Sequence, residues 1–259
     1  LVACAGLTAK AGVLEDFPFN DADGTGLAAA TNVANPGNQW VEDTDHAASI
    51  QVQGGALHIE KNDTNFVTEG LEIADVATGK LWLVADFAGW SVLGQAPDSG
   101  NVEEIRFGFN SGDDLIPPPS STVLAEMQLK RDFDANAMVL TGVALGGGGT
   151  SLGDTIVNMV QDSPFTMVLA IDQDTDTYEV LYRDGAAAFA SAGSGALEPT
   201  RDALIVRFTV NNFWGDVSGE FADLDRVYVT DVDPTIIPEP TSLALWAGAS
   251  LILVRRRRS

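Results

Sequence analysis

Three aspartates at alternate positions are the side chains in this sequence best suited to bind a metal ion. Asp172, Asp174 and Asp176 offer carboxylate oxygens, which are the hard ligands that calcium prefers. The segment lacks the central glycine and the twelfth-position glutamate of an EF-hand loop, and aspartate-rich segments of this length also form ordinary turns. Calcium is therefore the one cofactor that the sequence suggests, with a metal-free turn as the alternative.

Catalytic groups are poorly represented. A glycoside hydrolase needs two carboxyl groups roughly 5 to 9 Å apart, and the best candidate strand, residues 103–109 (EEIRFGF), lacks the aspartate and second glutamate that family 16 glucanases carry there. His46 and His58 have no spacing typical of a zinc site, and the sequence contains no Gly-x-Ser-x-Gly motif. We therefore assign no catalytic residue and predict that the chain is not an enzyme.

Tryptophan side chains indicate a second kind of chemistry, because sugar rings stack on exposed aromatic faces. Trp82 and Trp90 flank a predicted strand, where aromatic residues usually belong to the core. Trp214 instead lies in a polar segment beside Asn211 and Asn212, whose amides can bind sugar hydroxyls. These three residues form the predicted ligand-binding site.

The charge of the chain excludes one class of partner. The formal net charge is -23, and four of the fourteen basic residues are the terminal Arg255 to Arg258, so the remainder is even more acidic. Such a surface repels phosphate backbones, so we expect that the protein does not bind nucleic acid. Cys4 is the one cysteine, so no intramolecular disulfide can form.

The N-terminal residues have the features of the end of a signal peptide. Residues 1–7 are largely apolar, and Ala9-Lys10-Ala11 places small side chains at the alternate positions that signal peptidase recognises, with cleavage before Gly12. Residues 1–4 (LVAC) also resemble a lipobox, which would place a lipid on Cys4. A third interpretation is an N-terminal strand of the fold. The first two imply export.

The C-terminal residues have the features of a weak membrane anchor. Residues 241–254 (TSLALWAGASLILV) carry no charge and precede four arginines. As a helix this segment would be about 21 Å long, shorter than the roughly 30 Å hydrocarbon core. The arginines would stay on the cytoplasmic side, which places the preceding domain outside.

Pro238-Glu239-Pro240, the apolar segment and Arg255, Arg256, Arg257 and Arg258 together resemble the PEP-CTERM sorting domain of Gram-negative bacteria. The resemblance covers about the last 22 residues. It implies that an exosortase recognises and cuts the tail, that the tail is a transient inner-membrane anchor, and that the protein reaches the cell envelope or the extracellular space. Members of that family occur with exopolysaccharide systems.

Period-two alternation predicts strands through most of the chain. Apolar side chains share one face in residues 81–87, 105–109, 165–171 and 204–210, which is typical of half-buried strands with one polar side. Asp184-Gly185 is a hairpin signal, and residues 172–177 predict a turn between two strands. Many strands joined by such turns predict an all-β fold, an antiparallel two-sheet sandwich.

Residues 165–185 (FTMVLAIDQDTDTYEVLYRDG) resemble laminin G and concanavalin A-like jelly rolls, in which a strand ending in aspartate leads into a Tyr-x-Val-x-Tyr hairpin. We therefore expect residues 1–11 to be the end of a signal peptide, 12–233 a sandwich domain, and 234–259 the sorting tail with a short apolar helix. The expected function is a non-catalytic surface or matrix protein that binds polysaccharide or a surface component. The alternative is a secreted glycan-active enzyme.

Overall fold

The computed structural model describes residues 12–42, 50–60, 66–76, 78–91, 104–112, 122–132, 137–144, 150–157, 163–199, 201–211 and 221–236. Five features predicted above lie outside these residues: the signal-peptide segment with Cys4, His46, Asn212 with Trp214, the Pro238-Glu239-Pro240 motif, and the apolar segment with Arg255 to Arg258. The expectation of a C-terminal helix belongs to the same undescribed part. Among the described residues, no helix is long and apolar enough to cross a membrane.

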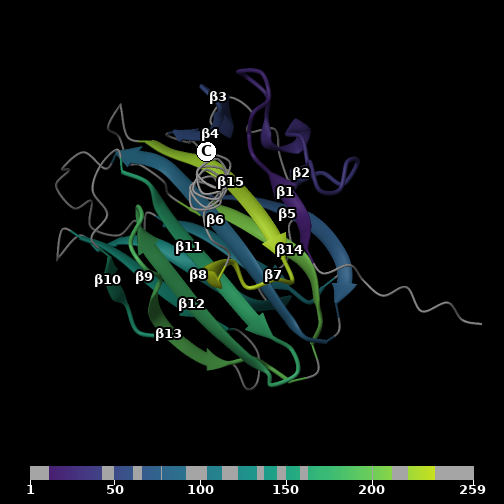
Figure 1. Cartoon of the computed structure of the whole chain (residues 1–259), viewed down its shortest axis with the longest axis vertical. Helices are drawn as coiled ribbons and strands as arrows, with labels where there is room; N and C mark the ends of the chain where they lie inside the picture. The colour runs from purple at the N-terminus through teal and green to yellow at the C-terminus, as the bar shows by residue number, and fades with distance from the viewer. Residues whose placement is uncertain are drawn as a thin grey trace, which may run out of the picture.

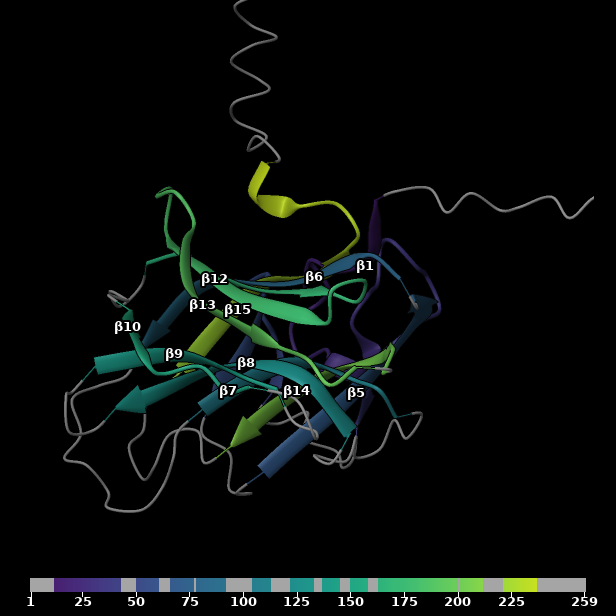
Figure 2. The same cartoon turned by 90° about the horizontal axis from the view of Figure 1, so that it is seen from below.

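Alternating apolar residues form two antiparallel sheets that face each other, as Figures 1 and 2 show. The first, sheet A, has the strand order β13-β12-β11-β6-β15-β4-β3, with β1 beside β15. Its strands are β1 (Val13–Phe17), β3 (Ile50–Gln53), β4 (Ala56–Glu60), β6 (Lys80–Ser91), β11 (Phe165–Asp172), β12 (Thr177–Asp184), β13 (Ala190–Ala196) and β15 (Phe221–Thr230). The predicted all-β sandwich is confirmed.

The second, sheet B, has the order β10-β9-β8-β7-β14-β5-β2. Its strands are β2 (Val41–Glu42), β5 (Phe66–Val76), β7 (Glu104–Asn110), β8 (Val123–Asp132), β9 (Ala137–Val143), β10 (Thr155–Val157) and β14 (Ala203–Asn211). Two short 3-10 helices, η1 (Leu27–Ala29) and η3 (Pro234–Ile236), accompany the sheets. In Figure 2, η3 lies on the outer side of sheet A.

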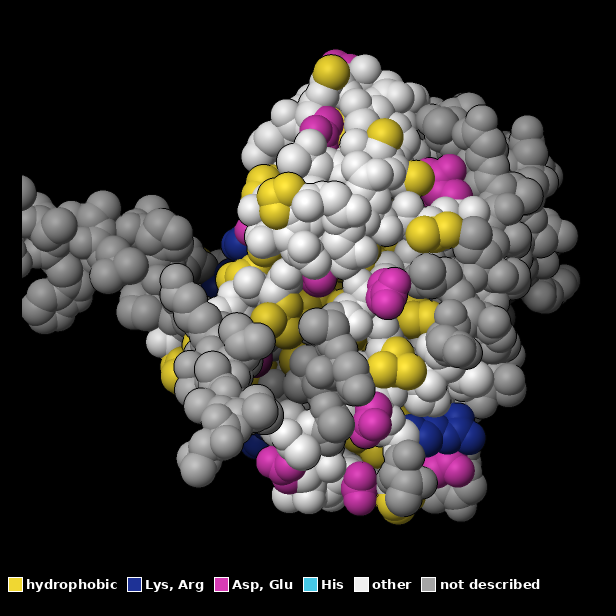
Figure 3. Space-filling view, turned by 90° about the vertical axis from the view of Figure 1, so that its right-hand side faces the viewer, with side chains coloured by type: hydrophobic (Ala, Val, Ile, Leu, Met, Phe, Trp, Pro, Cys, Tyr) yellow, Lys and Arg dark blue, Asp and Glu magenta, His cyan; other side chains and the backbone are white. Residues whose placement is uncertain are grey.

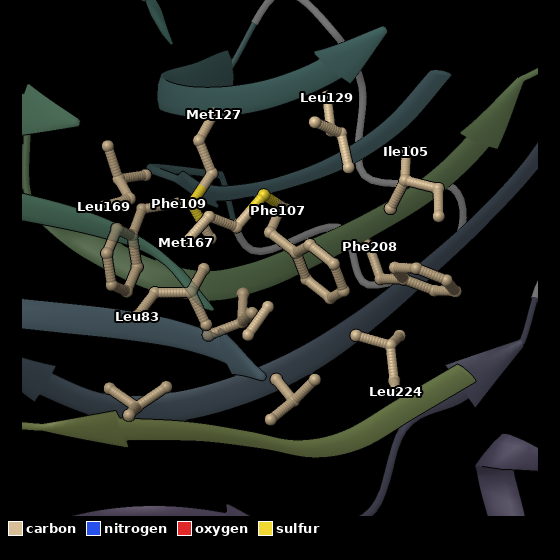
Figure 4. Close-up of a cluster of buried hydrophobic side chains, with 14 of the residues drawn as sticks. Leu83, Ile105, Phe107, Phe109, Met127, Leu129, Met167, Leu169, Phe208 and Leu224 are labelled. Carbon is tan, nitrogen blue, oxygen red and sulfur yellow. The ribbon is translucent and has the colours of Figure 1, made fainter. Parts of the chain in front are cut away.

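The core fills the space between the sheets, where large apolar side chains from both layers meet (Figure 4). Burying one such side chain contributes roughly 1.5 to 3 kcal/mol. Phe165, Met167, Leu169 and Ile171 belong to this core, whereas Val168 belongs to a separate cluster on the other face of β11. The predicted strand register is confirmed, because a shift of one residue would exchange the two faces.

The outer face of sheet A differs from the polar surface that the alternation predicts. Val84 and Val168 are 1% and 0% exposed, and Trp82 is 9% exposed. These residues lie on the central strands β6 and β11, where partly buried apolar side chains from β12, β15 and the β12–β13 loop pack against them. Sheet A is therefore apolar on both sides at its centre.

Candidate functional site

A groove of about 700 Å³ lies on the outer face of sheet A. It crosses strands β6, β11, β12 and β13, and η3 contributes one rim. Its lining combines apolar side chains with carboxylates, hydroxyls and one amine. The residues are Lys80, Trp82, Ala170, Ile171, Asp172, Thr177, Tyr178, Glu179, Leu181, Phe189, Ser194, Gly195, Asp233 and Thr235.

The ladder register determines which side chains share the floor of the groove. Ala170 on β11 pairs with Trp82 on β6 and with Glu179 on β12. The small alanine side chain leaves open space between the tryptophan and the carboxylate. Phe189, in the connection between β12 and β13, completes the apolar floor, and the Arg183 guanidinium lies 4.9 Å from the centre of its ring. This cation–π contact helps to hold Phe189 over the sheet.

The rim carries three carboxylates. Asp172 forms an ion pair with Lys80, at 3.3 Å from Oδ2 to Nζ. Glu179 Oε1 accepts a hydrogen bond from Ser191 Oγ at 2.7 Å. Asp233 Oδ1 accepts two hydrogen bonds from Thr235, from the backbone N–H at 2.8 Å and from the hydroxyl at 2.7 Å. The groove thus places hydrogen-bonding groups around an apolar floor.

The aspartate-rich segment predicted to bind calcium forms the turn between β11 and β12, as expected for a connection between strands. Asp172 Oδ1 accepts the backbone N–H groups of Asp174 and Thr175, at 3.1 and 3.2 Å. Burial raises the pKa of Asp172, but hydrogen bonds from Lys80, Thr175 and Asp174 lower it by more.

These contacts provide no support for metal binding. Within the described part of the chain, no group of three acidic, histidine or cysteine side chains could hold a metal ion. Asp172 stabilises the turn through the protein's own donors. Calcium at Asp172, Asp174 and Asp176 stays a prediction.

The outer face of sheet B carries a second polar cluster, and it includes Glu104 from the strand considered for catalysis. Arg106 binds Glu104 and also Glu126 on the neighbouring strand, with Nη1 3.4 Å from Glu126 Oε1. The other Glu126 oxygen lies 3.3 Å from Arg207 Nη1. Burial lowers the pKa of Arg207, while the charge of Glu126 opposes this change. Both carboxylates are therefore ion-paired.

Those remaining sequence candidates that the structure describes lie apart from the groove. Asn211 ends β14 in sheet B, and its neighbours Asn212 and Trp214 lie outside the described residues. Trp90 belongs to the core, as predicted. His58 Nδ1 lies 2.6 Å from Asp223 Oδ1, and its ring stacks on Phe221.

Most groove residues were not predicted from the sequence, including Glu179 and Asp233 on the rim and Trp82 and Phe189 on the floor. The alternation of side chains along the strand could have placed Trp82. Leu81 and Leu83 face the core, so a tryptophan between them must lie on the opposite face. Phe189 had no comparable signal, because it lies between strands.

Comparison with known proteins identifies the fold. No family model and no curated protein matches the chain. Among solved structures, peanut lectin aligns over 85% of this chain and 97% of its own, with a TM-score of 0.50 and 10% identity. The lectin UEA-II complexed with galactose aligns over 83% and 96%, with a TM-score of 0.50 and 12% identity. The VIP36 exoplasmic/lumenal domain in its Ca2+/Man-bound form aligns over 80% and 86%, with a TM-score of 0.50 and 10% identity.

The chain thus has a legume-lectin-like, concanavalin A-like jelly-roll fold. At these identities the similarity concerns the fold alone.

Proposed function

We propose that this protein is an exported surface or extracellular-matrix protein whose sandwich binds polysaccharide without catalysing a reaction. The groove on sheet A is the observation that carries the proposal. Ligand sites combine apolar and aromatic walls with a few polar groups that fix orientation. The half-buried Phe189 offers aromatic surface to the C–H face of a sugar ring, Trp82 lines the floor with its small exposed part, and the rim offers hydrogen-bonding partners for the hydroxyl groups of the sugar.

The fold comparison supports the same function. Two of the similar structures are described with a bound sugar, galactose in UEA-II and mannose in VIP36. Polysaccharide is accordingly the proposed partner of this chain.

The terminal segments supply the cellular part of the proposal. Pro238-Glu239-Pro240 and the terminal arginines make the protein a candidate exosortase substrate. Its apolar tail would hold it briefly in the inner membrane before release to the cell envelope or beyond. This part rests on the sequence.

A secreted glycan-active enzyme is the competing proposal, because Glu104 and Glu126 lie close together on one sheet face. A glycosidase needs one of its two carboxyl groups as a proton donor, whereas here Arg106 and Arg207 occupy both. Their direct ladder partners on β7, β8 and β14 include no aromatic side chain for a sugar ring. The arrangement favours a structural role for the cluster.

Binding of the full chain to an array of bacterial and plant polysaccharides tests the proposal. Phe189→Ala should weaken binding of any captured glycan about fivefold, equivalent to about 1 kcal/mol, because it removes part of the aromatic floor. Ile156→Ala is the matched control: Ile156 is 66% exposed and lies on β10 of the other sheet. Equal binding by both variants, or release of reducing ends that Glu126→Gln abolishes, would contradict the proposal.

A further inference from the structure

We propose that the groove on sheet A binds a polysaccharide whose sugar units carry free, positively charged amino groups, held by Glu179 and Asp233. This inference rests on the proposed function and specifies its ligand class.

The described rim contains more negative than positive groups. Of its three carboxylates, Asp172 is balanced by Lys80 at 3.3 Å. Among the described residues, Glu179 and Asp233 receive hydrogen bonds only from uncharged donors, the Ser191 hydroxyl and Thr235. Such donors fix the direction of a carboxylate without cancelling its charge. The rim therefore carries two net negative charges, while the Arg183 guanidinium over Phe189 adds one positive charge next to the floor.

The hydrogen bonds also leave capacity for a ligand. Only Oε1 of Glu179 and Oδ1 of Asp233 accept hydrogen bonds from described residues. The second oxygen of each carboxylate can accept a bond from an ammonium group. Charge-assisted hydrogen bonds of this kind are about twice as strong as those between neutral groups.

The floor places these charges next to a stacking surface. Trp82 and Glu179 occupy the same register row on either side of Ala170. With strands about 4.8 Å apart, their backbones are about 10 Å apart, which leaves space for a sugar ring above Ala170. An amino group on that ring would point toward Glu179, and a second unit would lie toward η3 and Asp233.

Other polysaccharides fit this groove less well. A neutral sugar can donate hydroxyl hydrogen bonds to the two carboxylates, but it brings no positive charge to offset their negative charges. A uronic acid or sulfated polymer would be repelled by the rim and by the net charge of -23. Figure 3 shows acidic side chains spread over another side of the molecule, with few basic ones among them. A positively charged amino-sugar polymer matches both the negative charge of the rim and the negative net charge of the whole protein.

Three oligosaccharides of equal length provide the test: β-1,4-linked glucosamine, its fully N-acetylated form, and a uronic acid oligomer. Titration calorimetry with the full chain at pH 6 should show at least tenfold tighter binding of the glucosamine oligomer than of the N-acetylated form, and no binding of the uronate. The preference should shrink at high salt, because screening weakens the charge interaction.

Two double variants distinguish the contribution of the rim carboxylates from that of the overall negative charge. Glu179→Gln with Asp233→Asn should abolish the preference, so that the glucosamine oligomer and its N-acetylated form bind with equal affinity. Glu72→Gln with Asp225→Asn removes the same charge at two exposed positions outside the groove and should preserve the preference. Thermal unfolding confirms that each variant is folded.

The outcomes distinguish this inference from the proposed function. Equal binding of the amino and N-acetylated oligomers, or an amino preference that survives the rim variant, would overturn the inference and leave polysaccharide binding intact. Absence of binding to every glycan, here and on the array, would overturn both.

Discussion

Glu69 lies on the core face of β5, directly across the ladder from Phe208 on β14, and is 1% exposed. Neither carboxyl oxygen has a hydrogen-bond partner among the described residues. Burial raises its pKa well above the ordinary value of 4.5, and the nearby charge of Glu42 adds to the rise. The side chain is therefore tolerated in the core in its neutral form.

This raised pKa makes stability depend on pH. A group whose pKa is higher in the folded state contributes fully to stability below its unfolded pKa, and the contribution is lost as pH rises through the folded pKa. Each unit of increase corresponds to about 1.4 kcal/mol at high pH. Glu69→Gln cannot ionise, so it should unfold at a higher temperature than the parent above neutral pH, with the difference vanishing near pH 4.

Thermal unfolding across this pH range measures the effect. Glu72→Gln, at an exposed position on the same strand, is the control and should follow the parent protein throughout. A difference between Glu69→Gln and the parent that stays constant with pH would contradict the assignment.

Single residues also show how far sequence reasoning reaches. The core face of residues 165–171 was predictable, because every second side chain there is apolar and the period is two. Glu69 was not predictable, since a glutamate interrupts the apolar pattern at a position that only the ladder with Phe208 places in the core. The predicted site at Trp214 remains a prediction, and the groove depends on strands that are distant in sequence.

At the scale of elements, Tyr178 on β12 packs against β9 of the other sheet. Its ring lies in the core, its hydroxyl donates a hydrogen bond to the Thr150 carbonyl, and burial raises its pKa to about 12. Gly142 on β9 permits this packing: a Cβ there would lie 2.8 Å from Tyr178 Cε2 and equally close to Leu152 and Val180. The absence of a side chain lets the two sheets approach.

Gly142→Ala should therefore lower the free energy of unfolding by about 1 to 3 kcal/mol, the usual cost of overfilling a packed core. Gly153→Ala is the matched control, because nothing lies within 4 Å of its added Cβ. Urea unfolding of both variants compares the costs. An equal effect at the two positions would show that backbone entropy, and not the contact with Tyr178, sets the cost.

Connections were predictable to different degrees. The turn after Asp172 was expected from its aspartates, and the side chain of Asp172 accepts the local N–H groups as such turns require. Asp184-Gly185 also turns, with Gly185 at φ 52°, but β13 starts only at Ala190. The strands are thus joined by a longer connection than a two-residue hairpin. Its extra length supplies Phe189 to the groove.

At the scale of the whole molecule, the tail carries the most direct prediction. If an exosortase processes this chain, mass spectrometry of the mature protein from its native host should find a C-terminus near Pro238-Glu239-Pro240 and no peptide containing Arg255 to Arg258. Replacing the three motif residues by alanine should retain the tail and keep the protein with the membrane fraction. Extracellular protein that still ends in the arginines would contradict the sorting hypothesis.

Strand order is the part of the fold that local patterns could not supply. Turn signals predict that strands consecutive in sequence, such as β11 and β12, pair with each other. Sheet A also joins β6 to β11 and β15 to β4 across long stretches of chain. These pairings depend on tertiary packing, which no window of residues contains. They also create the groove, since Trp82 and Glu179 meet through β11.

The position of β15 has a consequence for the order of events during biosynthesis. This last strand lies inside sheet A, where it pairs with β6, β4 and β1, and Val13 at the start of the domain aligns with Thr230 at its end. A chain emerging from its N-terminus can therefore close sheet A only after residue 230 has appeared, with seven residues left before Pro238. For an exported chain, we expect the sandwich to stay open throughout passage across the membrane and to complete its fold beside the tail that still holds it there.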